Sequence, residues 1–109
     1  MNQISSIEQF EQIIKDTPLV LAYFSGENCS VCNSLKPKIE MLIEQSFPSV
    51  KYIEIKTAQN PLLSARFNIF TVPVLLLLVE GKEYIRESRN ISIVELSGKI
   101  DKIVQLYEQ

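Results

Sequence analysis

The sequence lacks histidine and tryptophan, and it contains only two cysteines. A structural zinc site takes four ligands, mostly cysteine and histidine side chains. A single chain of this composition therefore cannot supply such a site, and we expect no bound metal. Zinc remains possible only if two copies of the chain share four cysteines.

Neither sign of charge is in clear excess. The net charge is −2, the isoelectric point is near 5.1, and the lysines and arginines are spread along the chain. Proteins that bind nucleic acid or anionic membranes usually carry a basic patch. The composition therefore predicts neither kind of partner.

Long hydrophobic runs are also missing. The longest apolar run, Val72 to Val79, is interrupted by Pro73 and is far shorter than the roughly 20 residues that span a bilayer. The segment from Met1 to Phe10 does not have the basic stretch and apolar stretch of an export signal. We therefore expect a cytoplasmic protein that does not enter the membrane.

The chain has enough apolar residues for one core. Its 109 residues with 46% hydrophobic content are typical of a single domain, spanning residues 1–109. The expected elements are, in order, a helix from the Ser5–Glu8 capping box to Asp16, a strand Leu19–Phe24, a helix from Asn28 to Phe47 with Pro37 inside it, a strand Val50–Lys56, a short helix Asn60–Phe67, a strand Val74–Val79, a strand Glu83–Arg86, and a helix that begins at the Ser92–Glu95 capping box.

This order of elements predicts an α/β fold. Strands separated by helices normally pair in parallel through right-handed crossovers, and Glu80-Gly81 favours a tight hairpin between the last two strands. We expect a central mixed sheet of four or five strands, the fifth being a very short one near Gln3. Helices should cover both faces of this sheet.

The two cysteines, Cys29 and Cys32, lie between a buried strand and the start of a helix. Free backbone amides and the positive end of the helix dipole stabilise a thiolate at such a place, which lowers the thiol pKa. Asn28 is the expected N-cap. Cys32 begins the apolar face of the helix and should be the more buried. We therefore expect Cys29 to attack a disulfide and Cys32 to resolve the mixed disulfide.

Other interpretations of the cysteine pair remain open. The two residues could be buried structural thiols, since cysteine is often buried. They could supply half of a zinc site shared by two chains. The chain could also be a redox-inactive binding module that keeps both cysteines without using them.

Together with their surroundings, these residues resemble the thioredoxin family over essentially the whole chain. The resemblance implies the thioredoxin fold and a thiol–disulfide oxidoreductase that reduces protein disulfides. A redox-inactive thioredoxin-like adaptor is the alternative. The matching segments are Cys29-Ser30-Val31-Cys32 after the buried strand, Pro37 five residues later, Gln59-Asn60-Pro61 before the short helix, Thr71-Val72-Pro73 before the next strand, and Gly81 in the hairpin.

The resemblance also implies roles and partners. In the family, the proline that matches Pro73 is cis and faces the cysteine pair, and an X–Pro bond adopts cis with little loss of free energy. Thr71, Val72 and Pro73, together with Asn28, would then bind an extended segment of the substrate. The cysteines themselves carry two electrons, so no organic cofactor is implied. A thioredoxin-reductase-like protein would supply the electrons, and we expect a monomer.

Two positions in the predicted central strands depart from the family pattern. Tyr23 stands where the family has an acid thought to deprotonate the resolving cysteine, and Glu54 stands where a lysine usually accompanies that acid. A tyrosine, with an ordinary pKa near 10, cannot replace a carboxylate as the base. Glu54 could replace the acid if its carboxylate points inward, but a solvated position is the simpler expectation.

The immediate surroundings of the cysteines differ from the family as well. Asn28 replaces the usual tryptophan, Ser30-Val31 replaces Gly-Pro, and Arg89 replaces a small residue on a loop beside the active site. A cation on that loop should favour acidic or polar partners. These changes predict a reductase with a narrower range of substrates.

Overall fold

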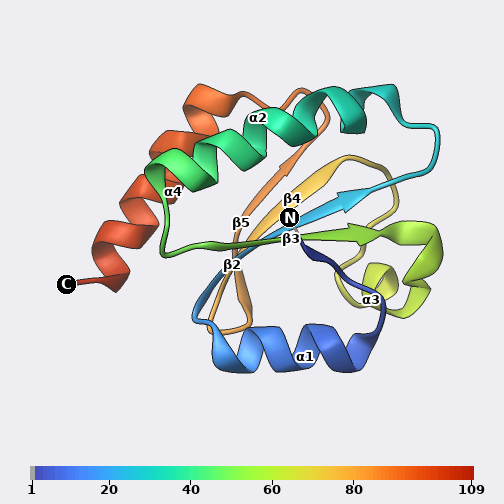
Figure 1. Ribbon diagram of the computed structural model, residues 1–109, viewed down its shortest axis with the longest axis horizontal. Helices are drawn as coiled ribbons and strands as arrows, with labels where there is room; N and C mark the ends of the chain where they lie inside the picture. Colours follow the sequence, from blue (N-terminus) through green and yellow to red (C-terminus); the bar gives the residue numbers. More distant parts are fainter. Residues whose placement is uncertain (1) are drawn as a thin grey trace.

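The computed structural model describes residues 2–109 and is built around a five-stranded mixed sheet with helices on both faces (Figure 1). Every expected helix and strand is present, which confirms the α/β class. A short 3-10 segment, η1, adds to them. The elements are β1 (Asn2–Gln3), α1 (Ile7–Asp16), β2 (Leu19–Ser25), α2 (Ser30–Ser46), β3 (Lys51–Lys56), η1 (Thr57–Gln59), α3 (Pro61–Arg66), β4 (Val74–Val79), β5 (Lys82–Ser88) and α4 (Ile93–Tyr107).

Continuous apolar segments form the centre of the sheet. The strand order is β1-β3-β2-β4-β5, and every residue of β2 and β4 is buried. Strands covered by helices on both faces need hydrophobic residues at every position, which explains these uninterrupted runs. β5 lies at the edge, and most of its residues are exposed.

The direction of β4 differs from the sequence prediction. β1 and β2 pair in parallel with β3, but β4 pairs antiparallel with β2. A six-residue helix such as α3 is only about 9 Å long, whereas a six-residue strand such as β3 is about 20 Å long. This helix is too short to return the chain to the start of β3, so β4 begins where β3 ends and runs back.

The sheet separates two layers of core. Helices α2 and α4 cover one face, and α1 and α3 cover the other (Figure 1). Side chains alternate along β2, so Tyr23 lies under α2 with Cys32, whereas Phe24 lies on the opposite face with Phe10 of α1. Within residues 2–109, no helix has the length and apolar character needed to cross a bilayer.

The first helix begins one residue later than the sequence predicts. The N-cap of α1 is Ser6, whose hydroxyl accepts a hydrogen bond from the backbone N–H of Gln9 at 3.1 Å. The side chain of Gln9 in turn accepts from the backbone N–H of Ser5 at 2.9 Å. Ser6 and Gln9 therefore take the place of the predicted Ser5–Glu8 capping box, with the Gln9 side chain reaching the residue before the N-cap.

Candidate functional site

Cys29 and Cys32 lie between β2 and the first turn of α2, where they form a disulfide. Their Cα atoms are 5.2 Å apart, a usual separation for a disulfide. Cys32 is 2% exposed, whereas Cys29 is only partly buried. The predicted difference in burial is therefore present, and Cys29 is the cysteine that a partner can reach more easily.

The sequence predicts Asn28 as the N-cap of α2, but the N-cap in the structure is Cys29. The Cys29 Sγ accepts a hydrogen bond from the backbone N–H of Cys32 at 3.1 Å. Asn28 instead has a φ of 51°, a left-handed conformation that asparagine tolerates better than most residues. A helix amide and the helix dipole therefore act directly on the Cys29 sulfur, and both favour its thiolate form.

The segment Thr71–Pro73 packs beside the loop that leads to Cys29. The Val72–Pro73 bond is cis, as the family resemblance implies. A Cβ atom at Gly26 would lie 3.0 Å from the Val72 Cγ2, so glycine is needed for the two segments to approach this closely. The backbone of Val72 makes no hydrogen bond to any part of residues 2–109. It is therefore available to an external segment.

Tyr23 is fully buried under α2. Its hydroxyl donates a hydrogen bond to the backbone carbonyl of Cys32 at 2.8 Å. Burial, followed by the negative charge of Glu54, raises the pKa of Tyr23 to about 12. The phenol therefore stays protonated at neutral pH. It serves as a donor that holds the start of α2, and it cannot accept a proton from a thiol.

Replacing Tyr23 with phenylalanine is expected to lower the free energy of unfolding by about 1 kcal/mol, because the ring packing is kept while one buried hydrogen bond is lost. Urea denaturation measures the change. Tyr84, which is 59% exposed, offers the matched Tyr→Phe control, with an expected effect below about 0.5 kcal/mol. Equal effects at the two positions would show that the hydrogen bond to Cys32 adds no stability.

Glu54 is buried, with 3% exposure, and the expectation of a solvated side chain is wrong. It pairs with Tyr23 across β2 and β3. The Ser25 hydroxyl donates to the Glu54 Oε2 at 2.8 Å, and the Lys36 Nζ donates to the Oε1 at 3.0 Å. The Lys56 Nζ lies 3.6 Å from the Oε2. This carboxylate is enclosed because β3 is inside the sheet and α2 covers this face.

The surroundings of Glu54 keep it ionised. Burial by itself raises the pKa of Glu54, but the hydrogen bonds from Lys36 and Ser25 and the charges of Lys36 and Lys56 outweigh it and hold the pKa below its usual value. Proton transfer from an ordinary thiol to such a carboxylate is unfavourable by about 5 kcal/mol or more. Through its contact with Lys36, the Glu54 carboxylate links β3 to α2.

The partners of Glu54 were not among the residues that the sequence singled out. Ser25 and Lys36 lie in β2 and α2, far from Glu54 in the sequence, so no local pattern joins them to it, whereas Lys56 lies two residues further along β3. The one available signal is the alternation along β3, which puts Glu54 on the face opposite Ile53 and Ile55. Within residues 2–109, no cluster of three or more potential metal-ligating side chains is present.

Arg89 directly follows β5. The last residue of β5, Ser88, pairs with Val74, the residue after Pro73. Arg89 is exposed and has a φ of 60°. That Arg89 lies beside the cysteine pair stays a prediction of the sequence.

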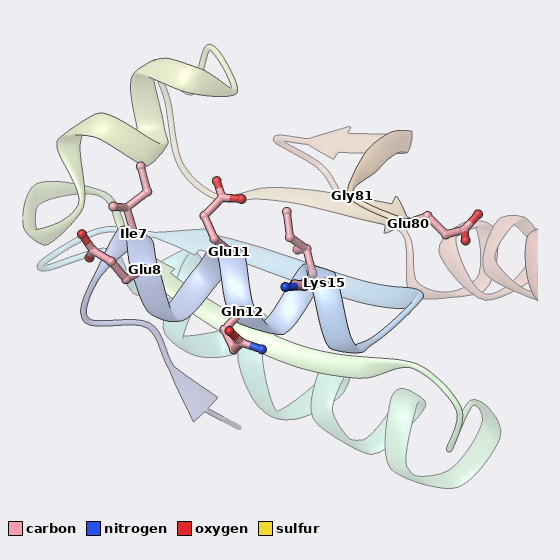
Figure 2. Close-up of a pocket in the computed structure, with 8 residues that line it drawn as sticks. Ile7, Glu8, Glu11, Gln12, Lys15, Glu80 and Gly81 are labelled. Atoms are coloured by element: carbon pink, nitrogen blue, oxygen red, sulfur yellow. The ribbon is translucent and has the colours of Figure 1, made fainter.

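A second surface feature lies away from the cysteines. Figure 2 shows a hollow between α1 and the turn that joins β4 to β5. Because α1 packs on the sheet face opposite α2, the hollow is not part of the cysteine site. It contains no cysteine, serine or threonine side chain. Its lining residues are Ile7, Glu8, Glu11, Gln12, Ile14, Lys15, Glu80 and Gly81.

Comparisons with known proteins agree with this geometry. The thioredoxin-like protein YdfQ of Bacillus subtilis is 33% identical over 108 residues, covering 99% of this chain and 96% of its own. The thioredoxin of Chlamydia caviae is 31% identical over 109 residues, covering 100% and 98%. The thioredoxin of Fasciola hepatica shares the fold, with a TM-score of 0.84 at 23% identity over 94% of this chain and 98% of its own.

The family model described as Thioredoxin matches residues 2–102, nearly the whole chain. The disulfide-bonded pair lies at the start of α2, where thiol–disulfide exchange is favoured. The chain therefore belongs to the thioredoxin family, and its general chemistry is that of a thiol–disulfide oxidoreductase.

Proposed function

We propose that this protein is a monomeric cytoplasmic reductase of protein disulfides, with Cys29 as the nucleophile and Cys32 as the resolving thiol. The observation that carries the proposal is the hydrogen bond from the Cys32 N–H to the Cys29 Sγ. It favours negative charge on the more accessible of the two sulfurs. Protein disulfides are the proposed substrates, and nucleic acid is not.

The proposed reaction has two exchange steps. The Cys29 thiolate attacks one sulfur of the substrate disulfide, a mixed disulfide forms, and the other substrate sulfur leaves as a thiolate that takes up a proton. The Cys32 thiolate then attacks the Cys29 sulfur and releases the second substrate thiol. The substrate gains two electrons, and the protein is left with the Cys29–Cys32 disulfide. A thioredoxin-reductase-like protein would return the two electrons.

Substrate positioning is assigned to Thr71, Val72 and Pro73, with Asn28 on the other side of the cysteines. Val72 offers an unpaired backbone next to the Gly26 loop, which supports pairing with an extended substrate segment in the manner of an added strand. Asn28 and Thr71 are both exposed. An incoming chain can therefore contact them without displacing the core.

Glu54 is proposed as a positioning residue. Its ion pair with Lys36 joins β3 to α2 one helical turn beyond Cys32, and its lowered pKa makes it too weak a base to deprotonate the resolving thiol. Cys32 would instead lose its proton to water when the substrate is bound. Tyr23 supports the same turn through the Cys32 carbonyl.

The alternative function is a redox-inactive adaptor that binds proteins through the same surface. The replacement of the family's buried acid by Tyr23 and the presence of Arg89 favour it. In an adaptor, no selection maintains the reactivity of the thiol. The adaptor therefore predicts an ordinary Cys29 pKa of about 8.5, and the reductase predicts a clearly lower one.

The reductase should catalyse the reduction of insulin by dithiothreitol well above the rate of dithiothreitol alone. Turbidity from the released insulin chain measures this rate, and the pH dependence of iodoacetamide alkylation measures the pKa of Cys29. A lowered pKa with catalysis supports the reductase. An ordinary pKa with no rate above dithiothreitol alone would leave the adaptor as the function.

A further inference from the structure

We propose that Arg89 makes the protein selective for disulfides whose cysteine is flanked by acidic side chains. This inference rests on the proposed function, because it concerns the substrate of the same cysteine pair. The substrate segment is an extended peptide that pairs with Val72, places a carboxylate against Arg89 and sets an apolar group on Phe70.

The sheet register brings the parts of this surface together. Val74 of β4 pairs with Ser88 on one side and with Phe24 on the other. Arg89 follows Ser88, and the loop that leads to Cys29 follows Phe24 by two residues, so both loops leave the sheet beside the start of β4. Neighbouring strands are about 5 Å apart, so these two loops flank the segment that precedes β4.

Packing under this surface supports the same arrangement. The Val72 side chain contacts Gly26. Cys29, Val72 and Ile91 all pack against the core cluster that contains Cys32. Ile91 follows Arg89 by two residues and its N–H donates to the Arg89 carbonyl at 2.9 Å, so the loop after β5 turns back onto the same cluster. A peptide bound along Val72 therefore passes beside Arg89.

Within residues 2–109, the charge of Arg89 has no partner. Arg66 pairs with Glu11, and Arg86 pairs with Glu83. Arg89 makes no ion pair with any side chain of residues 2–109, although Glu27 is exposed in the loop before Cys29. Its left-handed φ of 60° would suit glycine better. An exposed, unpaired guanidinium at this place is ready to pair with a substrate carboxylate.

Apolar side chains complete the surface. Phe70 is 87% exposed and Val31 is 56% exposed, although large hydrophobic side chains are usually covered. Phe70 precedes Val72 by two residues, and Val31 lies between the two cysteines. An exposed aromatic ring at this position offers a contact for an apolar side chain of the bound peptide. The surface thus combines an aromatic contact with one positive charge.

Single-turnover kinetics with charged peptides test the proposal. Each peptide carries one cysteine joined to a neutral thiopyridyl group, and glutamate, glutamine or lysine is placed in turn at each flanking position. Release of thiopyridone by the pre-reduced protein reports the attack by Cys29. At the flanking position where charge has the largest effect, the glutamate peptide should react about fivefold faster than the lysine peptide at low salt. High salt should remove this difference.

Substitutions distinguish the effect of Arg89 on these rates from the effect of other charged residues. Arg89→Gly, which suits the left-handed φ, should bring the ratio of the two rates close to one, and Arg89→Glu should reverse it. Lys82→Glu makes the same change of charge at the opposite end of β5 and should keep the wild-type ratio. The net charge of −2 favours basic peptides weakly, so a preference for glutamate has to come from a local group.

The outcomes are distinct. The role of Arg89 is overturned if the wild-type ratio of the two rates is near one at every position. It is also overturned if Lys82→Glu and Arg89→Glu lower this ratio equally. Phe70→Ser should slow all peptides alike, and unchanged rates would remove Phe70 from the surface. If the protein also fails to reduce insulin, the proposed function fails. Insulin reduction without any peptide preference refutes only the selectivity.

Discussion

Replacing Cys29 with serine is expected to slow disulfide reduction by more than about 100-fold, to the rate of dithiothreitol alone. A serine hydroxyl does not attack disulfides at neutral pH, because exchange requires a thiolate. Replacing Cys32 with serine should have a different result. Cys29 remains partly exposed at the cap of α2, so the first exchange still occurs, but the mixed disulfide cannot be resolved and accumulates.

Intact-mass measurement of the protein after mixing with a disulfide substrate separates these two variants. The Cys32→Ser protein should gain the mass of one substrate chain, and the Cys29→Ser protein should gain none. Ser34→Ala, a change of an exposed residue in the same helix, is the control for general effects on α2. Trapping by Cys29→Ser instead would reverse the two roles. Normal catalysis by both variants would remove the pair from the reaction.

Most of the fold was predictable from local signals. Leu19–Phe24 and Val74–Val79 are uninterrupted apolar runs, and such runs predict central strands because helices cover both faces. Ser92 caps α4 as predicted, since its hydroxyl accepts from the Glu95 N–H. The direction of β4 was not predictable in this way. It depends on the length of α3 relative to β3, and a helix boundary is uncertain by one or two residues.

The candidate site was predictable only in part, for a related reason. The spacing of Cys29 and Cys32 and their place before a helix are local features. The environment of Glu54 is not, because its contacts to Ser25 and Lys36 join residues that are far apart in the sequence. Charged residues are rarely buried unless they are paired, so a carboxylate considered without its partners is expected at the surface.

The ion pair between Lys36 and Glu54 yields the largest expected change in stability. Replacing Lys36 with methionine should lower the free energy of unfolding at neutral pH by about 2–3 kcal/mol. Removing one partner of a buried charge usually costs about 3–5 kcal/mol, and here Lys56 remains 3.6 Å from the carboxylate. The same change at Lys38, an exposed residue of α2, is the control and should alter stability by less than about 0.5 kcal/mol.

The pH dependence has a definite sign. The contacts of Glu54 hold its pKa below the usual value, so the stability that they contribute is fully present above the pKa of the unfolded chain, about 4.3, and is lost as the pH falls through the lower folded value. Without Lys36, fewer contacts oppose the effect of burial, so the pKa of Glu54 rises. The difference between wild type and Lys36→Met should therefore shrink on acidification.

A double-mutant cycle shows whether the two side chains act together. In a Glu54→Gln background, Lys36→Met should cost less than about 1 kcal/mol, because no buried charge is left without its partner. Equal costs in both backgrounds would contradict the coupling.

The same variants test the role of Glu54 in catalysis. A positioning residue predicts that Glu54→Gln changes the rate of insulin reduction but leaves the shape of its pH profile unchanged, whereas a general base predicts that an inflection disappears.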